Sequence, residues 1–180
     1  MKLLRTIRLD ASDSFVYEKT AAPGEWAVSG AFAFARDEPA KLHGKARSAF
    51  RADFLGLASL GRSTLVQIVQ ASEADRRAVV EMLAAQLVAH FGAPDVCAAR
   101  SAAQDEIGFA ASLCVHPAGV VVAVTRSYEA GAIRETFRAL RSRERAGQHA
   151  RAFEFLEVVG DENAPDEYLD LAGLGKGAGA

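Results

Sequence analysis

The chain has 180 residues, of which 50% are hydrophobic and 24% charged, the composition of a globular protein with its own core. Its formal net charge of −2 provides no basic surplus to neutralise phosphates, so we do not expect a nucleic-acid partner. Charges at Arg5, Arg8 and Asp10 interrupt the apolar start, and no stretch approaches the roughly 18 apolar residues of a membrane span. We therefore expect a cytoplasmic protein without a signal peptide or membrane segment.

The first part of the chain predicts strands. Residues 2–9 and 14–18 are expected to form an antiparallel hairpin, because turn-forming residues separate them. Residues 26–35 alternate between bulky and small side chains, which predicts a third strand. Gly30, in its middle, marks either a bulge or a close backbone approach. The bulky set of this strand is Trp26, Val28, Phe32 and Phe34.

The middle of the chain predicts three helices and one strand. Helical spacing of apolar residues predicts a helix over 41–57, and a run rich in β-branched residues predicts a strand over 65–69. Ser72 is expected to begin the next helix, because its side-chain oxygen can accept a hydrogen bond from an unpaired N–H group, and Gly92 ends it. Residues 94–114 predict a further helix with a stripe of small residues. This stripe allows close, antiparallel packing against the preceding helix.

The last part of the chain predicts a central strand and another helix. The valine-rich run 119–125 is typical of a strand buried on both faces. Ser127 is expected to cap a helix whose inner face carries Ile133, Phe137 and Leu140.

These elements favour an α+β fold. A last strand is expected over 153–159, and the glycine- and alanine-rich end predicts a flexible tail at 172–180. Strands cluster early and mix with helices later, which favours a mostly antiparallel or mixed sheet with helices packed on one side. We expect one domain, over residues 1–171.

Cysteines and histidines give no sign of a metal site. Cys97 and Cys114 fall on one predicted helix, roughly 25 Å apart at about 1.5 Å per residue, too far for a disulfide. We interpret both as small core thiols in a reducing compartment. None of the four histidines has a second ligand at metal-site spacing, so we expect no metal, and nothing predicts a cofactor.

The sequence also contains no motif that predicts a catalytic or nucleotide-binding site. A G-x-S-x-G nucleophile motif is absent. The segment 56–63 (GLASLGRS) resembles the phosphate loop G-x-x-x-x-G-K-[ST] with arginine in place of lysine. It follows a predicted helix and precedes a strand, the reverse of the order that a phosphate loop needs, so we interpret it as a turn.

Four residues are candidates for a ligand site between the sheet and the helices. Arg126 and Ser127 stand where a strand gives way to a predicted helix, a place where small anions bind. A capping serine without any ligand explains the same residues. His116 lies in an irregular corner beside an apolar strand, and Trp26 is the fourth candidate. A purely structural or exposed histidine remains the alternative for His116.

An arginine-rich segment is the candidate partner-binding surface. Arg134, Arg138 and Arg141 share one face of the predicted helix, and guanidinium groups suit carboxylates and phosphates. The following segment, 154–170, is acidic. The arginines therefore either form a solvated, salt-bridged face with it or bind a partner, which would be an acidic protein surface or a small anion.

The opening MKLLRTIRLDASDSF and the phrase PGEWAVSGAFAFA resemble the start of a family of small, uncharacterised bacterial proteins known only as a domain of unknown function. The resemblance covers most of the chain. It implies a bacterial cytoplasmic protein and transfers no active site.

The leading hypothesis is a non-catalytic accessory or binding protein that forms homo-oligomers or binds another protein. It depends on an apolar-rich composition without a recognisable reacting constellation. The alternative is a small enzyme or a small-anion-binding domain with a pocket between the sheet and the helices.

Overall fold

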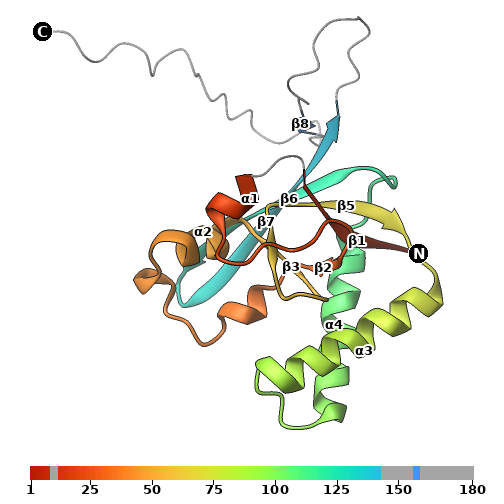
Figure 1. Ribbon diagram of the computed structural model, residues 1–180, viewed down its shortest axis with the longest axis horizontal. Helices are drawn as coiled ribbons and strands as arrows, with labels where there is room; N and C mark the ends of the chain where they lie inside the picture. Colours follow the sequence, from red (N-terminus) through yellow and green to blue (C-terminus); the bar gives the residue numbers. More distant parts are fainter. Residues whose placement is uncertain (9–11, 143–155, 159–180) are drawn as a thin grey trace, which may run out of the picture.

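One antiparallel sheet organises the protein. The computed structural model describes residues 1–8, 12–142 and 156–158, and over these residues eight strands pair in the order β4-β3-β2-β1-β5-β6-β7-β8 (Figure 1). This confirms a single α+β domain with an antiparallel sheet. The strands are β1 (Lys2–Ile7), β2 (Trp26–Val28), β3 (Phe54–Gly56), β4 (Arg62–Ser63), β5 (Leu65–Gln70), β6 (Val121–Glu129), β7 (Ala132–Ser142) and β8 (Leu156–Val158).

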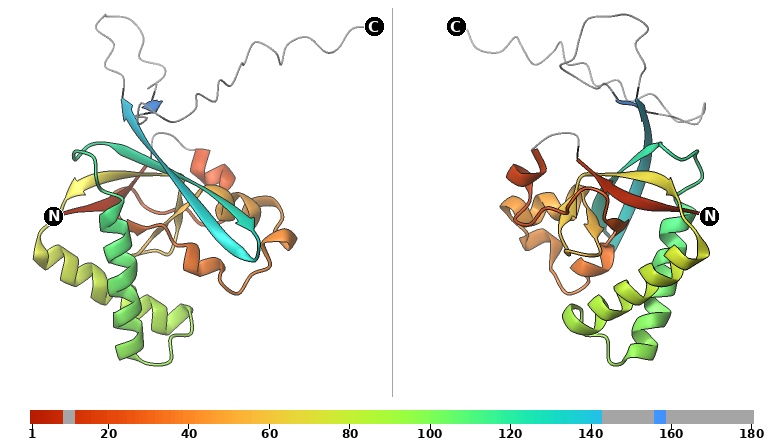
Figure 2. Two further views of the ribbon diagram at one scale, coloured as in Figure 1. Left: turned by 180° about the vertical axis from the view of Figure 1, so that it is seen from behind. Right: turned by 45° about the vertical axis from the view of Figure 1, so that its right-hand side comes forward.

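Helices gather on one side of this sheet, as predicted (Figure 2). Phe109 of α4 packs against Phe137 of β7, and the Phe50 carbonyl of α2 bonds to the same face of β6. No described helix combines the length and the apolar content needed to cross a membrane. The helices are α1 (Ser12–Val16), α2 (Gly44–Ala52), α3 (Glu73–His90) and α4 (Val96–Ser112), with short 3₁₀ helices η1 (Ala31–Phe34) and η2 (Pro39–Lys41).

Helix α3 begins and ends where the sequence predicts. The Ser72 hydroxyl accepts a hydrogen bond from the Asp75 backbone N–H at 3.0 Å, and the Asp75 carboxylate accepts one from the Ser72 N–H at 2.8 Å. This reciprocal capping box satisfies two N–H groups that would otherwise lack partners. Gly92 has a φ of 72°, the left-handed conformation that closes a helix.

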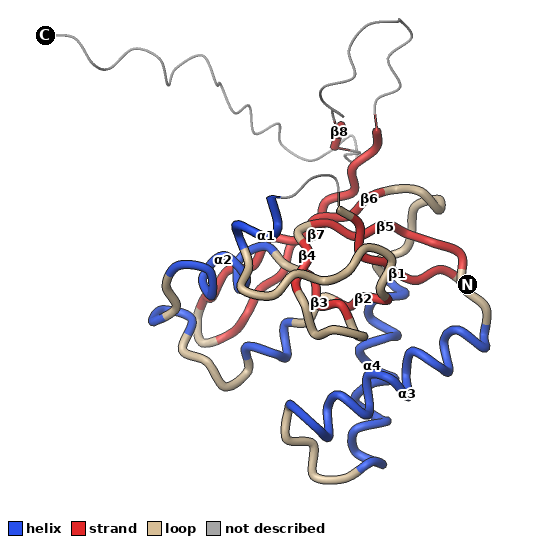
Figure 3. The backbone as a smooth tube through the Cα atoms, viewed as in Figure 1, coloured by secondary structure: helices blue, strands red, loops and turns tan. Residues whose placement is uncertain are grey.

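Helices α3 and α4 pack against each other, as the small-residue stripe predicts (Figure 3). Ala99 and Ala103 of α4 are fully buried, because side chains of this size let two helix backbones approach closely. Cys114, just after α4, is a buried thiol as expected, whereas Cys97 is exposed, so its assignment to the core is wrong. Cys97 stands in the first turn of α4.

The predicted hairpin at the N-terminus is wrong. Strand β1 pairs with β2 and β5. Residues 14–18 form no strand, because the first three of them belong to helix α1, which covers Ser12–Val16. The turn is closed by a hydrogen bond from the Tyr17 N–H to the Asp13 carbonyl, and the Asp13 carboxylate binds the Thr64 hydroxyl at 2.6 Å. These contacts fix the segment as a helical turn.

The alternating segment 26–35 is a strand only at its start. Gly30 has a φ of 74°, and the chain then enters η1. A Cβ at Gly30 would lie 2.7 Å from the Leu55 Cβ, closer than two such atoms can approach. Of the two predicted roles of this glycine, the close approach is therefore the one that the structure shows. The bulky residues after it pack in aromatic pairs, Phe32 against Phe91 and Phe34 against Phe50.

The helix predicted over 41–57 is shorter than expected. Helix α2 covers Gly44–Ala52, and the next residues enter the sheet as β3. Phe54 and Leu55 are fully buried there, because β3 pairs with β2 on one side and β4 on the other.

The helix predicted after Ser127 is also wrong, because that segment is strand β7. The chain turns at Ala130 and Gly131, whose φ values of 51° and 82° suit a tight hairpin turn that matches the twist of paired strands. Strand β6 is central, and the expected burial on both faces holds only at its start: Val121 and Val122, on opposite faces, are both buried, whereas Thr125, on the face of Val121, is exposed. None of the described helices covers that outer face (Figure 2).

The predicted last strand is confirmed over Leu156–Val158, which pairs with the end of β7. The remainder of that prediction and the tail predicted at 172–180 lie outside the described residues.

Candidate anion-binding cleft beside a buried arginine

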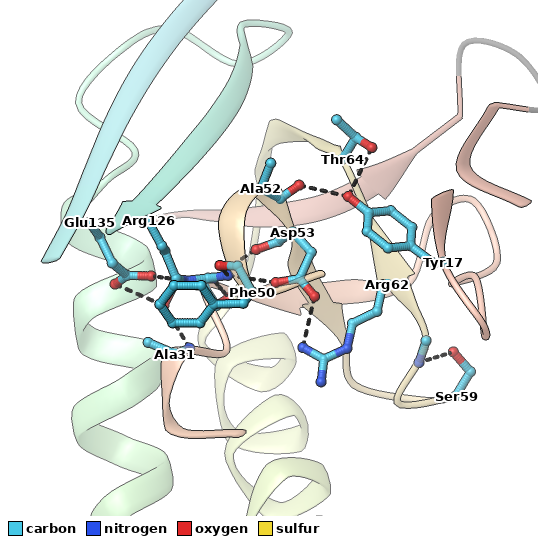
Figure 4. Close-up of polar contacts among 12 residues, drawn as sticks. Tyr17, Ala31, Phe50, Ala52, Asp53, Ser59, Arg62, Thr64, Arg126 and Glu135 are labelled. Carbon is cyan, nitrogen blue, oxygen red and sulfur yellow. Dashed lines mark hydrogen bonds and ion pairs between the residues drawn. The ribbon is translucent and has the colours of Figure 1, made fainter. Parts of the chain in front are cut away.

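An arginine is the largest fully buried side chain among the described residues. Arg126 of β6 is only 2% exposed, and its guanidinium group donates five hydrogen bonds (Figure 4). Nε donates to Glu135 at 2.6 Å, and Nη1 donates to the Asp53 carboxylate at 2.6 Å and to the Phe50 carbonyl at 3.3 Å. Nη2 donates to the carbonyls of Asp53, at 2.7 Å, and Ser29. Arg126 thus joins β7, α2 and the ends of β2 and β3.

Asp53 balances this charge from the beginning of β3. Its carboxylate is fully buried and forms a second ion pair, at 2.9 Å, with the guanidinium of Arg62 from β4. Burial raises the pKa of the Asp53 carboxyl, and the two guanidinium groups oppose that shift. The three side chains form a buried ionic network that depends on every member being paired.

Tyr17 extends this network towards the N-terminus. Its hydroxyl donates to the Ala52 carbonyl at 2.6 Å and lies 3.0 Å from the Thr64 hydroxyl (Figure 4). Burial raises the pKa of Tyr17 to about 12. The phenol therefore stays protonated and donates its hydrogen bond over the whole physiological pH range.

A second carboxyl group lies beside Glu135. Glu106 of α4 has a buried Oε1 without a hydrogen-bond partner in the described part of the chain. Burial raises the pKa of Glu106, and the negative charge of Glu135 raises it further. Ser29 donates from its hydroxyl to Glu135 at 3.2 Å. The arrangement favours one ionised and one protonated carboxyl group.

A cleft opens on the outer side of this network. It has a volume of about 290 Å³ and lies between α2, η2 and the end of β6. Three arginines and no carboxylate line the cleft. One of them, Arg126, already forms ion pairs with Asp53 and Glu135. The lining residues are Pro39, Ala40, Arg47, Phe50, Arg51, Arg126, Ser127 and Tyr128.

The two other arginines give the cleft its charge. Arg47 and Arg51 are exposed and stand one helical turn apart on α2. Neither guanidinium has an ion-pair partner among the residues that the structure describes. Residues four apart on a helix have Cβ atoms about 5–6 Å apart, which lets both guanidinium groups reach one anion. Phosphate and carboxylate groups match their fork geometry.

The structure brings together two of the four predicted ligand residues. Arg126 and Ser127 both line the cleft, although Ser127 caps no helix and donates instead to Glu129 at 2.9 Å. His116 is elsewhere: its carbonyl accepts a hydrogen bond from the Lys2 ammonium at 2.5 Å. Trp26 lies under the guanidinium of Arg5, 3.8 Å from the ring centroid, and does not line the cleft.

Arg47 and Arg51 were not predicted as ligand residues. Their signal in the sequence is the four-residue spacing of two arginines on the polar side of a predicted helix. That spacing alone does not distinguish a binding site from an ordinary solvated helix face, because the opposing residues come from β6 and η2.

The predicted arginine face on a helix does not exist. Arg134, Arg138 and Arg141 all belong to β7, in which Arg134 and Arg138 are exposed on the outer face. The side chain of Arg141 lies outside the described residues. Arg134 forms an ion pair with Glu129 at 3.4 Å, and both side chains are mostly exposed. An exposed pair of this kind contributes little to stability.

The turn that resembles a phosphate loop is occupied by the protein's own carboxylate. Glu25 accepts hydrogen bonds from the Ser59 backbone N–H at 2.8 Å and from its hydroxyl at 3.0 Å. Burial raises the pKa of Glu25, but these hydrogen bonds lower it more, so it lies below its usual value. The interpretation as a turn rather than a nucleotide site agrees with this geometry.

Possible metal ligands are not grouped in the described ranges. No three His, Cys, Asp or Glu side chains there come together as a metal ion would require. The two cysteines are both free thiols.

The fold and the site together define a single-domain α+β protein with a buried ionic network and an arginine-lined cleft. A family model described as "Family of unknown function (DUF6505)" matches residues 1–154, and the chain belongs to this family. This confirms the resemblance seen in its opening residues. Neither the curated proteins nor the solved structures contain a match to the chain.

Proposed function

We propose that the protein is a non-catalytic binding protein that holds a small anionic molecule in the cleft between α2 and β6. One observation carries the proposal: the cleft is lined by three arginines and no carboxylate, and Arg47 and Arg51 have no ion-pair partner within the described ranges. A phosphate or carboxylate group is the ligand that such a pair recognises.

The buried network supports this role by fixing the walls of the cleft. Phe50 is held from two sides, since its carbonyl accepts from Arg126 and its ring packs edge-on against Phe34 at 5.4 Å. Helix α2 is thereby held in place next to β6. Arginines carried on a fixed helix bind an anion at a lower entropic cost than arginines on a flexible segment.

Titration with inorganic phosphate tests the proposal. The double variant R47Q/R51Q removes both unpaired cations and should weaken phosphate binding at least tenfold, measured by calorimetry at low ionic strength. The matched control R77Q/R100Q removes two exposed charges from α3 and α4, neither of which lines the cleft, and should bind as the wild type does. Equal affinity of R47Q/R51Q and the control would contradict the proposal.

We also propose that the protein self-associates or binds another protein in the bacterial cytoplasm. Several large apolar side chains are exposed, Phe15 at 78% and Val115 at 76% among them, and such residues favour contact with a partner. The exposed Arg134 and Arg138 of β7 suit an acidic partner. Light scattering after size exclusion tests this: a monomer over a wide concentration range without a co-purifying protein would contradict it.

A further inference from the structure

The cleft has an apolar wall as well as a cationic one. Tyr128, Phe50 and Pro39 line it together with Ala40, next to the arginines of α2. Phe50 is 5% exposed and fixed by its contact with Phe34, so it forms the floor. An anion without an apolar part would use only one of the two walls.

Tyr128 is the exposed part of the apolar wall. It stands near the end of β6 and is 48% exposed, although a tyrosine ring is large enough to favour burial. Among the described residues no other aromatic ring packs against it, in contrast to Phe32, Phe34, Phe50, Phe54, Phe91, Phe109 and Phe137. Tyr128 is thus a half-exposed aromatic residue that a ligand in the cleft can reach.

We propose that the ligand is an aryl anion, whose phosphate or carboxylate group binds Arg47 and Arg51 while its ring stacks on Tyr128. This inference rests on the proposed function and adds the chemical class of the ligand. It follows from the cationic and apolar walls meeting in one cleft, because an aryl anion satisfies the arginines and also removes the apolar wall from water. The volume of about 290 Å³ accommodates one ring with one anionic group but not a dinucleotide.

The stacking contact sets the size of the expected effect. Offset or edge-to-face aromatic pairs contribute a factor of roughly 2 to 12 in affinity beyond the area they bury. Burial of the ligand ring adds to this factor. We therefore expect an aryl phosphate to bind about tenfold more tightly than inorganic phosphate.

Three ligands, each titrated into the full chain, separate the contributions of the anionic group, the size of the attached ring and its planarity. Phenyl phosphate, cyclohexyl phosphate and inorganic phosphate share the anionic group, and only the first has a flat ring. We expect affinity to fall in that order, with phenyl phosphate several-fold ahead of cyclohexyl phosphate. Benzoate, as a fourth probe, determines whether a carboxylate replaces the phosphate.

Variants of the stacking residue test the assigned contact. Tyr128→Phe keeps the ring and should retain the preference for phenyl phosphate over cyclohexyl phosphate, whereas Tyr128→Ala should abolish that preference. Phe15→Ala is the matched control, because Phe15 is an exposed aromatic residue outside the cleft. The side chain of Tyr128 is half exposed, so its removal should leave the near-UV circular dichroism of the buried aromatic residues unchanged.

The outcomes distinguish this inference from the function on which it rests. Equal affinities for phenyl, cyclohexyl and inorganic phosphate, all lost in R47Q/R51Q, would overturn the aryl assignment and leave anion binding intact. A preference for phenyl phosphate that persists in Tyr128→Ala would overturn the stacking contact. Failure of every probe to bind would overturn the proposed function and this inference together.

Discussion

The substitution Arg126→Met tests whether the buried ionic network stabilises the fold. It removes five hydrogen bonds and two ion pairs with a side chain of similar length. Asp53, which is fully buried, keeps only Arg62, and the carbonyls of Ser29 and Phe50 lose their donor. Removal of one partner of a buried ion pair costs about 3–5 kcal/mol, and we expect a loss of that size in the free energy of unfolding.

Urea unfolding followed by the fluorescence of Trp26, the single tryptophan, measures this loss. Arg134→Met is the matched control: its ion pair with Glu129 is long and exposed, so it should cost less than about 1 kcal/mol. Adding Asp53→Asn to Arg126→Met should cost less than the sum of the two single changes, because the unpaired buried charge is then removed. An Arg126→Met variant as stable as the control would refute the reasoning.

Three further changes test separate parts of the structure. Ser72→Ala breaks the capping box with Asp75 and should lower the free energy of unfolding by about 1 kcal/mol, measured by thermal denaturation. Burial raises the pKa of Glu106, so the folded state binds its proton more tightly than the unfolded state does, and this contribution to stability is lost as the pH rises from the ordinary value of 4.5 through the raised one. Glu106→Gln should remove that loss, so that urea midpoints measured between pH 4 and 8 fall less steeply than in the wild type; parallel profiles would contradict the assignment. Ala103→Leu overfills the contact between α3 and α4 and should cost about 1–3 kcal/mol in urea, whereas the exposed Ala102→Leu should be nearly neutral.

The sequence predicts those elements whose signals are local. The Ser72 cap, the Gly92 terminus and the valine-rich run before Arg126 each specify a structure within a few neighbouring residues, and all three are confirmed. The helix predicted after Ser127 depends on Ile133, Phe137 and Leu140, which are spaced four and three residues apart. Side chains in residues 132–142 also alternate with the period of two that is typical of a strand. The tight turn at Gly131 brings this segment next to β6, so it pairs as strand β7.

The site depends on contacts that local patterns do not carry. Arg126 and the exposed Thr125 are neighbours in one strand, and only the fold separates their environments. The partners of Arg126 lie between 9 residues away, at Glu135, and 97 residues away, at Ser29. The position of Arg126 at the end of a strand predicts that it binds a ligand. In the structure Arg126 lines the cleft, but the Asp53 carboxylate already neutralises its charge.

The separation of Asp53 and Arg126 in the chain has a consequence during synthesis. The two residues are 73 positions apart, so at about 5–20 residues per second the ribosome needs about 4–15 s to deliver the guanidinium after the carboxylate. Throughout that interval the only ion-pair partner that the described residues offer the Asp53 carboxylate, beside α2 and β3, is Arg62. The ion pair between Asp53 and Arg126 therefore cannot form before β6 has been synthesised, and a product truncated before Arg126 should leave Asp53 without this partner and remain a substrate for chaperones and proteases.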